Sequence, residues 1–122
     1  ALVREACAVV AGGAFDDDAP PARIHGDLWS GNVLFSPDGV VLIDPAAHGG
    51  HAETDLAILA LFGAPHLDAI LHGYQAESTL RAGWRARVPL HQLHPLAVHA
   101  AGHGRAYGVE LAEAARAVLA LA

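Results

Sequence analysis

A short hairpin constrains the fold of this chain most, because polar residues stand at both of its ends. Residues 33–35 and 40–43 are two β-rich runs, and Ser36-Pro37-Asp38-Gly39 between them is a strong turn signal. Asn32 directly precedes the first run and Asp44 directly follows the second. Because a hairpin brings the outer ends of its strands together, we expect Asn32 and Asp44 to be neighbours.

The rest of the chain is typical of helices. Apolar spacing predicts helices over 2–11, 66–78 and 89–103 and a last one marked by Leu111, Ala114, Ala115 and Val118. Residues 54–63 are apolar almost all round, which predicts a buried helix. We therefore expect an α+β, mainly helical domain with one small β-hairpin.

Two residues carry more specific structural expectations. Pro95 should break or kink the helix over 89–103 unless that helix begins there. Cys7 lies in an apolar helical stretch, which favours a small core residue over a reactive thiol.

The octapeptide before the hairpin, residues 25–32 (HGDLWSGN), carries a phosphotransfer pattern. It keeps the spacing of the kinase catalytic loop His-Arg-Asp-Leu-x-x-x-Asn, with Gly26 in place of Arg. Phosphoryl transfer from ATP needs positioning, Mg²⁺ and a carboxylate that accepts the proton of the attacking hydroxyl. Asp27 is then the base candidate, Asn32 offers an amide oxygen to Mg²⁺, and Asp44 takes the place of the first Asp of Asp-Phe-Gly.

A chance match is the alternative, since Asp-x-x-x-x-Asn is common and an Asp at a turn is usually a cap. The ordered set of His, Gly, Asp, Leu, Asn, hairpin and second Asp favours phosphotransfer. The net charge of −6 predicts a strict need for a divalent cation beside a nucleotide.

With these motifs the chain resembles the fructosamine kinase (ketosamine-3-kinase) family, within the wider aminoglycoside phosphotransferase and choline kinase group. The matching segments are HGDLWSGN (25–32), LIDPA (42–46), GHAETDLAILALFG (50–63), GWR (83–85) and HPL (94–96). The resemblance implies the C-terminal lobe of a protein kinase-like fold. It also implies an ATP- and Mg²⁺-dependent enzyme that phosphorylates the 3-hydroxyl of a ketosamine. That acceptor is a glycated amine, free or protein-bound, so the implied role is deglycation.

The resemblance also implies roles for five residues of this chain. They are a catalytic base (Asp27), magnesium ligands (Asn32 and Asp44), a support of the catalytic loop (Asp55) and an aromatic near the sugar (Trp29). Independently of the resemblance, we expect His25 to order the catalytic loop by hydrogen bonds and not to act as a base. A Trp face suits the apolar face of a sugar, although a core role for Trp29 stays equally open.

The chain departs from the family pattern near the acceptor side. Ala52 stands where the family often has Arg, and His48 and Gly49 stand where aromatics are frequent. These departures leave the physiological acceptor open.

The other half of a kinase site is missing from these residues. The N-terminal lobe of such enzymes supplies a phosphate-covering loop and a strand Lys. The chain contains no Lys, and Gly12-Gly13 ends a helix instead of following a strand. We expect residues 1–122 to be the catalytic-loop lobe alone, partnered by the N-terminal lobe of its own longer chain and inactive without it.

Three other functions have some support in the sequence. A zinc site could use the cluster of His48, His51, Glu53 and Asp55, although such sites usually contain Cys ligands. A silent kinase-like interaction module would be expected to lack the Asp and Asn residues that are present. A phosphotransferase acting on an aminoglycoside, choline or another sugar is the remaining alternative.

The composition of the chain argues against several classes of protein. Without a basic patch, nucleic-acid binding is not expected. No apolar run approaches the ~20 residues that span a bilayer, so we expect no membrane segment. A single Cys fits a reducing, cytoplasmic location.

Overall fold

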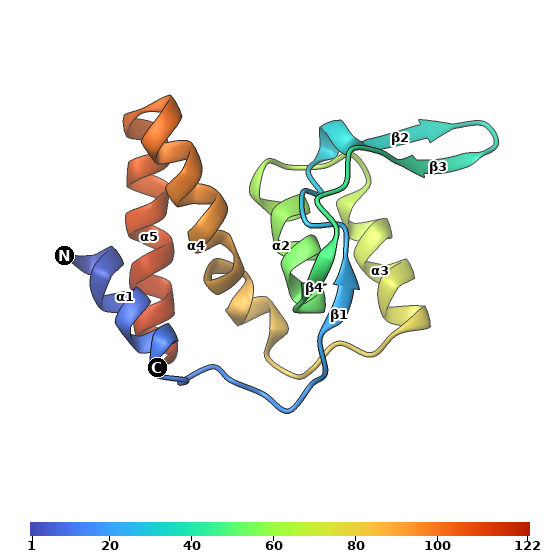
Figure 1. Ribbon diagram of the computed structural model, residues 1–122. Coiled ribbons are helices and arrows are strands. Elements are labelled where there is room, and N and C mark those ends of the chain that lie inside the picture. Colours follow the sequence, from blue (N-terminus) through green and yellow to red (C-terminus); the bar gives the residue numbers. More distant parts are fainter. The chain divides into compact units, whose positions relative to one another are not determined.

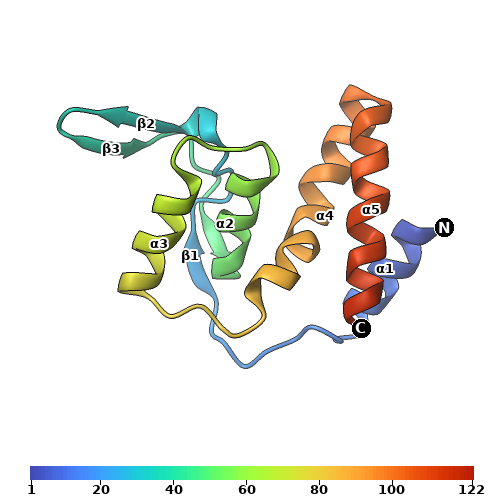
Figure 2. The ribbon, with the colours of Figure 1, turned by 180° about the vertical axis from the view of Figure 1, so that it is seen from behind.

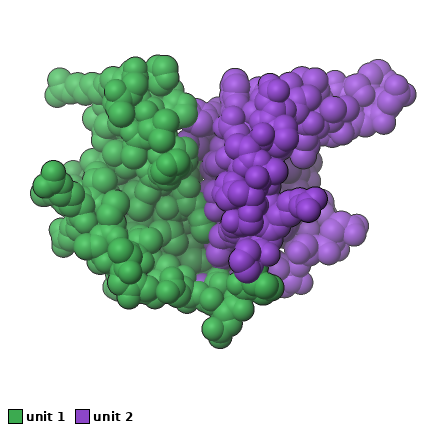
Figure 3. Space-filling model, in the orientation of Figure 1, with its two compact units in different colours: residues 1–20, 85–122 green, residues 21–84 purple.

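Two units divide the chain in the computed structural model, which describes all of residues 1–122 (Figure 3). One unit comprises residues 21–84 and contains the octapeptide and the hairpin. The other comprises residues 1–20 and 85–122 and is entirely helical apart from its loops.

The unit of residues 21–84 combines short strands with two helices (Figure 1). Its elements are β1 (Ala22–Ile24), a 3-10 turn η1 (Ser30–Asn32), β2 (Val33–Ser36), β3 (Gly39–Leu42), β4 (His48–Gly50), α2 (Ala52–Leu61) and α3 (Leu67–Glu77). β2 and β3 pair antiparallel from Val33 opposite Leu42 to Ser36 opposite Gly39, as the turn signal predicted. The expectation of one hairpin was incomplete, because β1 and β4 form a second antiparallel pair.

The core of this unit lies beneath the octapeptide. Its buried members come from the loop, the hairpin, α2 and α3 and are Leu28, Val33, Leu56, Leu59 and Leu71. The apolar run predicted over 54–63 is α2, which begins two residues earlier and buries five of its residues. Burial of each such side chain contributes about 1.5–3 kcal/mol, so the octapeptide is fixed to a packed base.

The β2–β3 hairpin, by contrast, is exposed over most of its length. It projects away from α2 and α3 in both ribbon views (Figures 1 and 2). Its exposed large apolar side chains are Leu34, Phe35, Val40, Val41 and Leu42. An isolated two-stranded hairpin is marginal in water, and an edge-on contact between the Phe35 ring and His66 supports its middle.

The helical unit contains α1 (Leu2–Ala11), α5 (Arg105–Leu121) and most of α4 (Trp84–His103). Its core centres on three buried residues, Ala6, Ala115 and Val118, with Leu90 and Leu93 packed against them. α1 turns the small side chain of Ala6 inward and leaves Cys7 exposed. The prediction of a core Cys7 was therefore wrong, because the neighbouring position on the helix is the one that faces α5.

α4 also differs from the prediction. It begins at Trp84, five residues earlier than expected, and runs through both Pro89 and Pro95. Each internal proline removes one backbone hydrogen bond. Packing keeps the helix together, since Leu96 is only 1% exposed just after Pro95. The carbonyl of Pro95 also accepts a hydrogen bond of 2.8 Å from Nδ1 of His99.

The observed architecture is α+β and mainly helical, as expected. None of the helices has the length and apolar character that crossing a membrane requires.

Candidate active site

The octapeptide begins in a turn that only glycine can form. Gly26 follows β1 with φ of +88°, in the left-handed region that ordinary residues avoid. A Cβ at this position would also overlap the backbone carbonyl of Ala46. Replacing the usual kinase Arg by Gly26 thus lets the loop lie directly against the chain that follows Asp44.

Hydrogen bonds from the backbone to the side chain of Asp55 hold this turn in place. Its carboxylate accepts the backbone N–H of His25 at 2.8 Å and that of Gly26 at 3.0 Å. The bonds join residues about 30 positions apart, from the first turn of α2 to the end of β1. Charge-assisted bonds of this kind are about twice as strong as neutral ones, so Asp55 couples the loop to the buried helix.

His25 fastens the same loop to the segment around Asp44. Its Nε2 donates to the carbonyl of Ile43 at 2.7 Å, and its own carbonyl accepts the N–H of Ala46 at 2.8 Å. Nδ1 accepts the N–H of Asp27 at 3.2 Å. A neutral imidazole with its proton on Nε2 satisfies both ring contacts. His25 therefore acts as a bridge within the loop and has no free nitrogen for proton transfer.

Asp27 and Asn32 are held together by the amide of Asn32. Its Nδ2 donates to the carbonyl oxygen of Asp27 at 2.9 Å and approaches Asp27 Oδ2 at 3.4 Å. Asn32 is 5% exposed, whereas Asp27 is exposed to solvent. Because Nδ2 is used internally, Oδ1 of Asn32 is the atom left to meet a cation.

The hairpin brings Asp44 beside Asn32, as the sequence predicted. The N–H of Ile43 donates to the carbonyl of Asn32 at 3.0 Å, which extends the β2–β3 ladder by one pair. Asp44 follows directly, is exposed, and has φ of +49°. A non-glycine residue in this region costs about 1–2 kcal/mol, although Asp tolerates it better than most. Strain of this kind is typical of functional sites.

Trp29 lies between the base candidate and the metal-ligand candidate. Its N–H donates to the carbonyl of Asp27 at 3.0 Å, and its carbonyl accepts the N–H of Asn32 at 2.9 Å. The indole is 43% exposed, so it is not a core residue. This exposure argues against a core role within these residues, and the place of Trp29 near the sugar stays a prediction.

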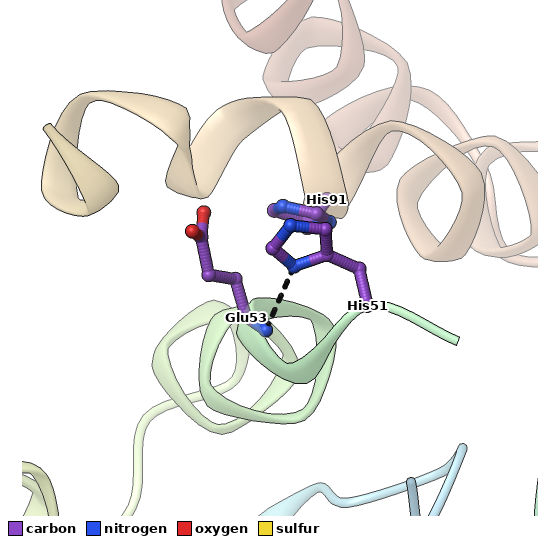
Figure 4. Close-up of side chains that lie close together, drawn as sticks. All are labelled: His51, Glu53 and His91. Atoms are coloured by element: carbon purple, nitrogen blue, oxygen red, sulfur yellow. Dashed lines mark hydrogen bonds between the residues drawn. The ribbon is translucent and has the colours of Figure 1, made fainter. Parts of the chain in front are cut away.

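The histidines proposed as zinc ligands have local structural partners. Nδ1 of His51 accepts the N–H of Glu53 at 3.1 Å and caps the start of α2 (Figure 4). Nδ1 of His48 donates to the carbonyl of Ala46 at 2.8 Å. Both oxygens of Asp55 are bonded to the loop, so this carboxylate serves the fold, and the zinc interpretation of the four residues stays a prediction.

A cavity of about 330 Å³ lies under the hairpin in the same unit. Its walls come mainly from β2, β3, α2 and α3, and include Phe35, Val40, Leu56 and Ile70. Such a lining does not suit phosphate. The polar chemistry of this unit is concentrated on the octapeptide and Asp44.

This arrangement of residues is typical of one class of enzyme. A loop with Asp and Asn five residues apart, a hairpin and a second Asp after it match the pattern of the catalytic segment in protein kinase-like phosphotransferases. Residues 3–121 match the family model described as fructosamine kinase. The chain belongs to the fructosamine kinase family.

The names of similar proteins are consistent with this family. The chain is 41% identical over 92 residues to a "Probable ketoamine kinase" of Enterococcus faecium, covering 75% of this chain and 33% of that protein. It is 37% identical over 78 residues to the mouse "Ketosamine-3-kinase", covering 64% of this chain and 25% of that protein. The chain thus spans about a third of the length of the first of these relatives and a quarter of the length of the second.

A solved structure confirms the fold. The crystal structure of a "putative fructosamine-3-kinase" from Thermobifida fusca superposes with a TM-score of 0.89 at 56% identity. The match covers 98% of this chain and 41% of the other. The kinase-like fold expected from the motifs is therefore shown.

Proposed function

We propose that residues 1–122 form the catalytic-loop portion of an ATP- and Mg²⁺-dependent phosphotransferase that phosphorylates a sugar hydroxyl of a glycated amine. The observation that carries the proposal is the contact between Asn32 Nδ2 and the carbonyl of Asp27. It occupies Nδ2 of Asn32, which would leave Oδ1 for a cation, while Asp27 is exposed to solvent. The names of the relatives support the acceptor class.

The residues fit Mg²⁺. Oδ1 of Asn32 and the exposed carboxylate of Asp44 are oxygen ligands, which this hard cation prefers, and the hairpin makes them neighbours. Bound there, Mg²⁺ would offset the negative charge of the transferring phosphates. The strained backbone of Asp44 is held on both sides by His25, through Ile43 and Ala46, so the ligand has little freedom to turn away.

Asp27 is proposed as the base. Its exposed carboxylate would accept the proton of the acceptor hydroxyl as the hydroxyl oxygen bonds to the γ-phosphorus of ATP, the bond from that phosphorus to the bridging oxygen breaks and ADP leaves. Nδ2 of Asn32 lies 3.4 Å from Oδ2 and, together with the fixed main chain of Asp27, limits rotation of the carboxylate. Asp55 holds the backbone of this loop, so the base is positioned by the buried α2.

The remaining clamp for ATP is proposed to come from an N-terminal lobe of the same longer chain. The absence of Lys and the exposed apolar residues of β2 and β3 both support this arrangement. An exposed apolar patch of this kind marks a contact surface. The ATP requirement favours the cytoplasm, and the acceptor class fits a role in deglycation.

An acceptor panel tests the proposal. The intact protein that carries these residues is incubated with ATP, Mg²⁺ and, in parallel, a fructosyl-amine, an aminoglycoside and choline. We expect turnover of the fructosyl-amine and its loss with a chelator. Turnover of a different acceptor alone would overturn the substrate class, and no turnover of any acceptor would overturn the enzymatic proposal.

A further inference from the structure

Gly31 lies directly under the ring of Trp29. A Cβ built on Gly31 would overlap Cη2, Cζ2 and Cζ3 of the indole, all at 2.5 Å or less. Real Cβ atoms essentially never come closer than 3.0 Å to another group. The three ring atoms are at nearly equal distances, which places this position over the face of the six-membered ring and not beyond its edge.

The backbone does not explain why a glycine stands here. Gly31 is in the middle of η1 and is not among the glycines with positive φ, whereas Gly26 is. Any residue could adopt the conformation of Gly31. A larger residue at this position would instead meet the indole, which would have to move.

The main chain of Trp29 is already fixed by its hydrogen bonds to Asp27 and Asn32. Only the side-chain torsions of Trp29 can still move the ring. One face of the ring rests on Gly31, and the 43% exposure of the side chain leaves other parts of the ring accessible. Trp29 follows the base candidate Asp27 by two residues in the chain.

We propose that Gly31 is a positioning residue that seats the indole of Trp29 flat on the catalytic loop, so that its outer face supports the apolar face of the acceptor sugar. This inference rests on the proposed phosphotransferase function. An apolar C–H face matches an aromatic face in shape and polarity, and orienting the sugar this way brings a hydroxyl toward Asp27.

The test is Gly31→Ala in the intact protein. The added methyl lifts the indole, so we expect the KM for the acceptor to rise about tenfold, while kcat and the KM for ATP stay within about twofold. Gly73→Ala is the matched control, because a Cβ at this position in α3 meets nothing within 4 Å. We expect it to leave all three constants unchanged.

Making Gly31→Ala in a Trp29→Phe variant distinguishes an effect of the methyl on the indole from an effect on the backbone of the loop. In Trp29→Phe the ring is too short to reach the positions of Cη2, Cζ2 and Cζ3, so the methyl of Gly31→Ala finds room. We expect Gly31→Ala to change the acceptor KM less than twofold in this background. An equal penalty in both backgrounds, or a change in the KM for ATP instead of the acceptor, would overturn the inference.

Failure of the inference about Gly31 can be distinguished from failure of the proposed function. If the intact protein phosphorylates an aminoglycoside or choline and not the fructosyl-amine, the substrate class of the proposal fails. The kcat and KM values of the native protein and of Gly31→Ala are then measured with the acceptor that the protein phosphorylates. A tenfold rise that disappears in the Trp29→Phe background still supports the positioning role, and an unchanged KM contradicts it.

Discussion

Asp55→Asn is the substitution that most sharply probes how the catalytic loop is held. The change keeps the size of the side chain but replaces one acceptor oxygen by an NH₂ group. Since both oxygens accept backbone N–H bonds, from His25 and Gly26, the new NH₂ faces a donor in either orientation. One bond is lost, and the other loses its charge assistance.

The magnitude follows from the two bonds. A hydrogen bond to a charged group contributes about 1.5–3 kcal/mol and a neutral one about half of that. Losing one bond and weakening the other therefore destabilises the closed loop by about 2–4 kcal/mol. At about 1.4 kcal/mol per factor of ten, the loop opens roughly 30- to 1000-fold more often.

Amide hydrogen exchange measures this opening directly. We expect the amides of His25 and Gly26 to exchange roughly 30- to 1000-fold faster in Asp55→Asn, up to the limit set by global unfolding. The control is Asp68→Asn, the same change at an exposed position in the first turn of α3, where the cost is about 0.3–1 kcal/mol. Unchanged exchange at His25 and Gly26, or an equal increase in the control, would refute the bracing role of Asp55.

Three further substitutions test other parts of the account. Gly26→Ala should destabilise by more than about 2 kcal/mol in urea unfolding, because it adds overlap with Ala46 to the left-handed strain of about 1–2 kcal/mol; Gly63→Ala, at φ of +70° with open space around it, should show the strain alone. Asp44→Gly should stabilise the fold by up to about 1 kcal/mol while Mg²⁺-dependent turnover is lost, so a stability loss would argue against strain at this residue. Leu59→Ala, at a side chain that is 2% exposed, should cost about 2–5 kcal/mol in the same assay, and a cost below 1 kcal/mol would contradict its place in the core.

The hairpin and the neighbourhood of Asn32 and Asp44 could be predicted because their signals are local. A Ser-Pro-Asp-Gly turn between β-rich runs specifies the pairing without help from the rest of the chain. The role of Asp55 could be predicted only from the family resemblance. Its hydrogen-bond partners are about 30 residues away, and the spacing of apolar residues does not reveal such a contact.

Other features depend on contacts that the sequence pattern does not express. The β1–β4 pair joins two three-residue strands, one of which contains two glycines, so neither has a recognisable period. α4 continues through Pro95 because the burial of Leu96 outweighs the lost hydrogen bond. The seat of Trp29 on Gly31 is a contact between side chain and main chain, which becomes visible only in three dimensions.

The proposed function depends most directly on Asp27 as the base of a phosphotransfer reaction. The most direct measurement is the kcat of the intact protein for phosphate transfer from ATP to a fructosyl-amine, compared between the native chain and Asp27→Asn. We predict a fall of about 10²–10⁴-fold, the range typical of general base catalysis, with the KM for ATP unchanged. The isolated residues 1–122 should show no turnover above that of their own Asp27→Asn variant. A kcat within twofold of the native value in Asp27→Asn would contradict the account.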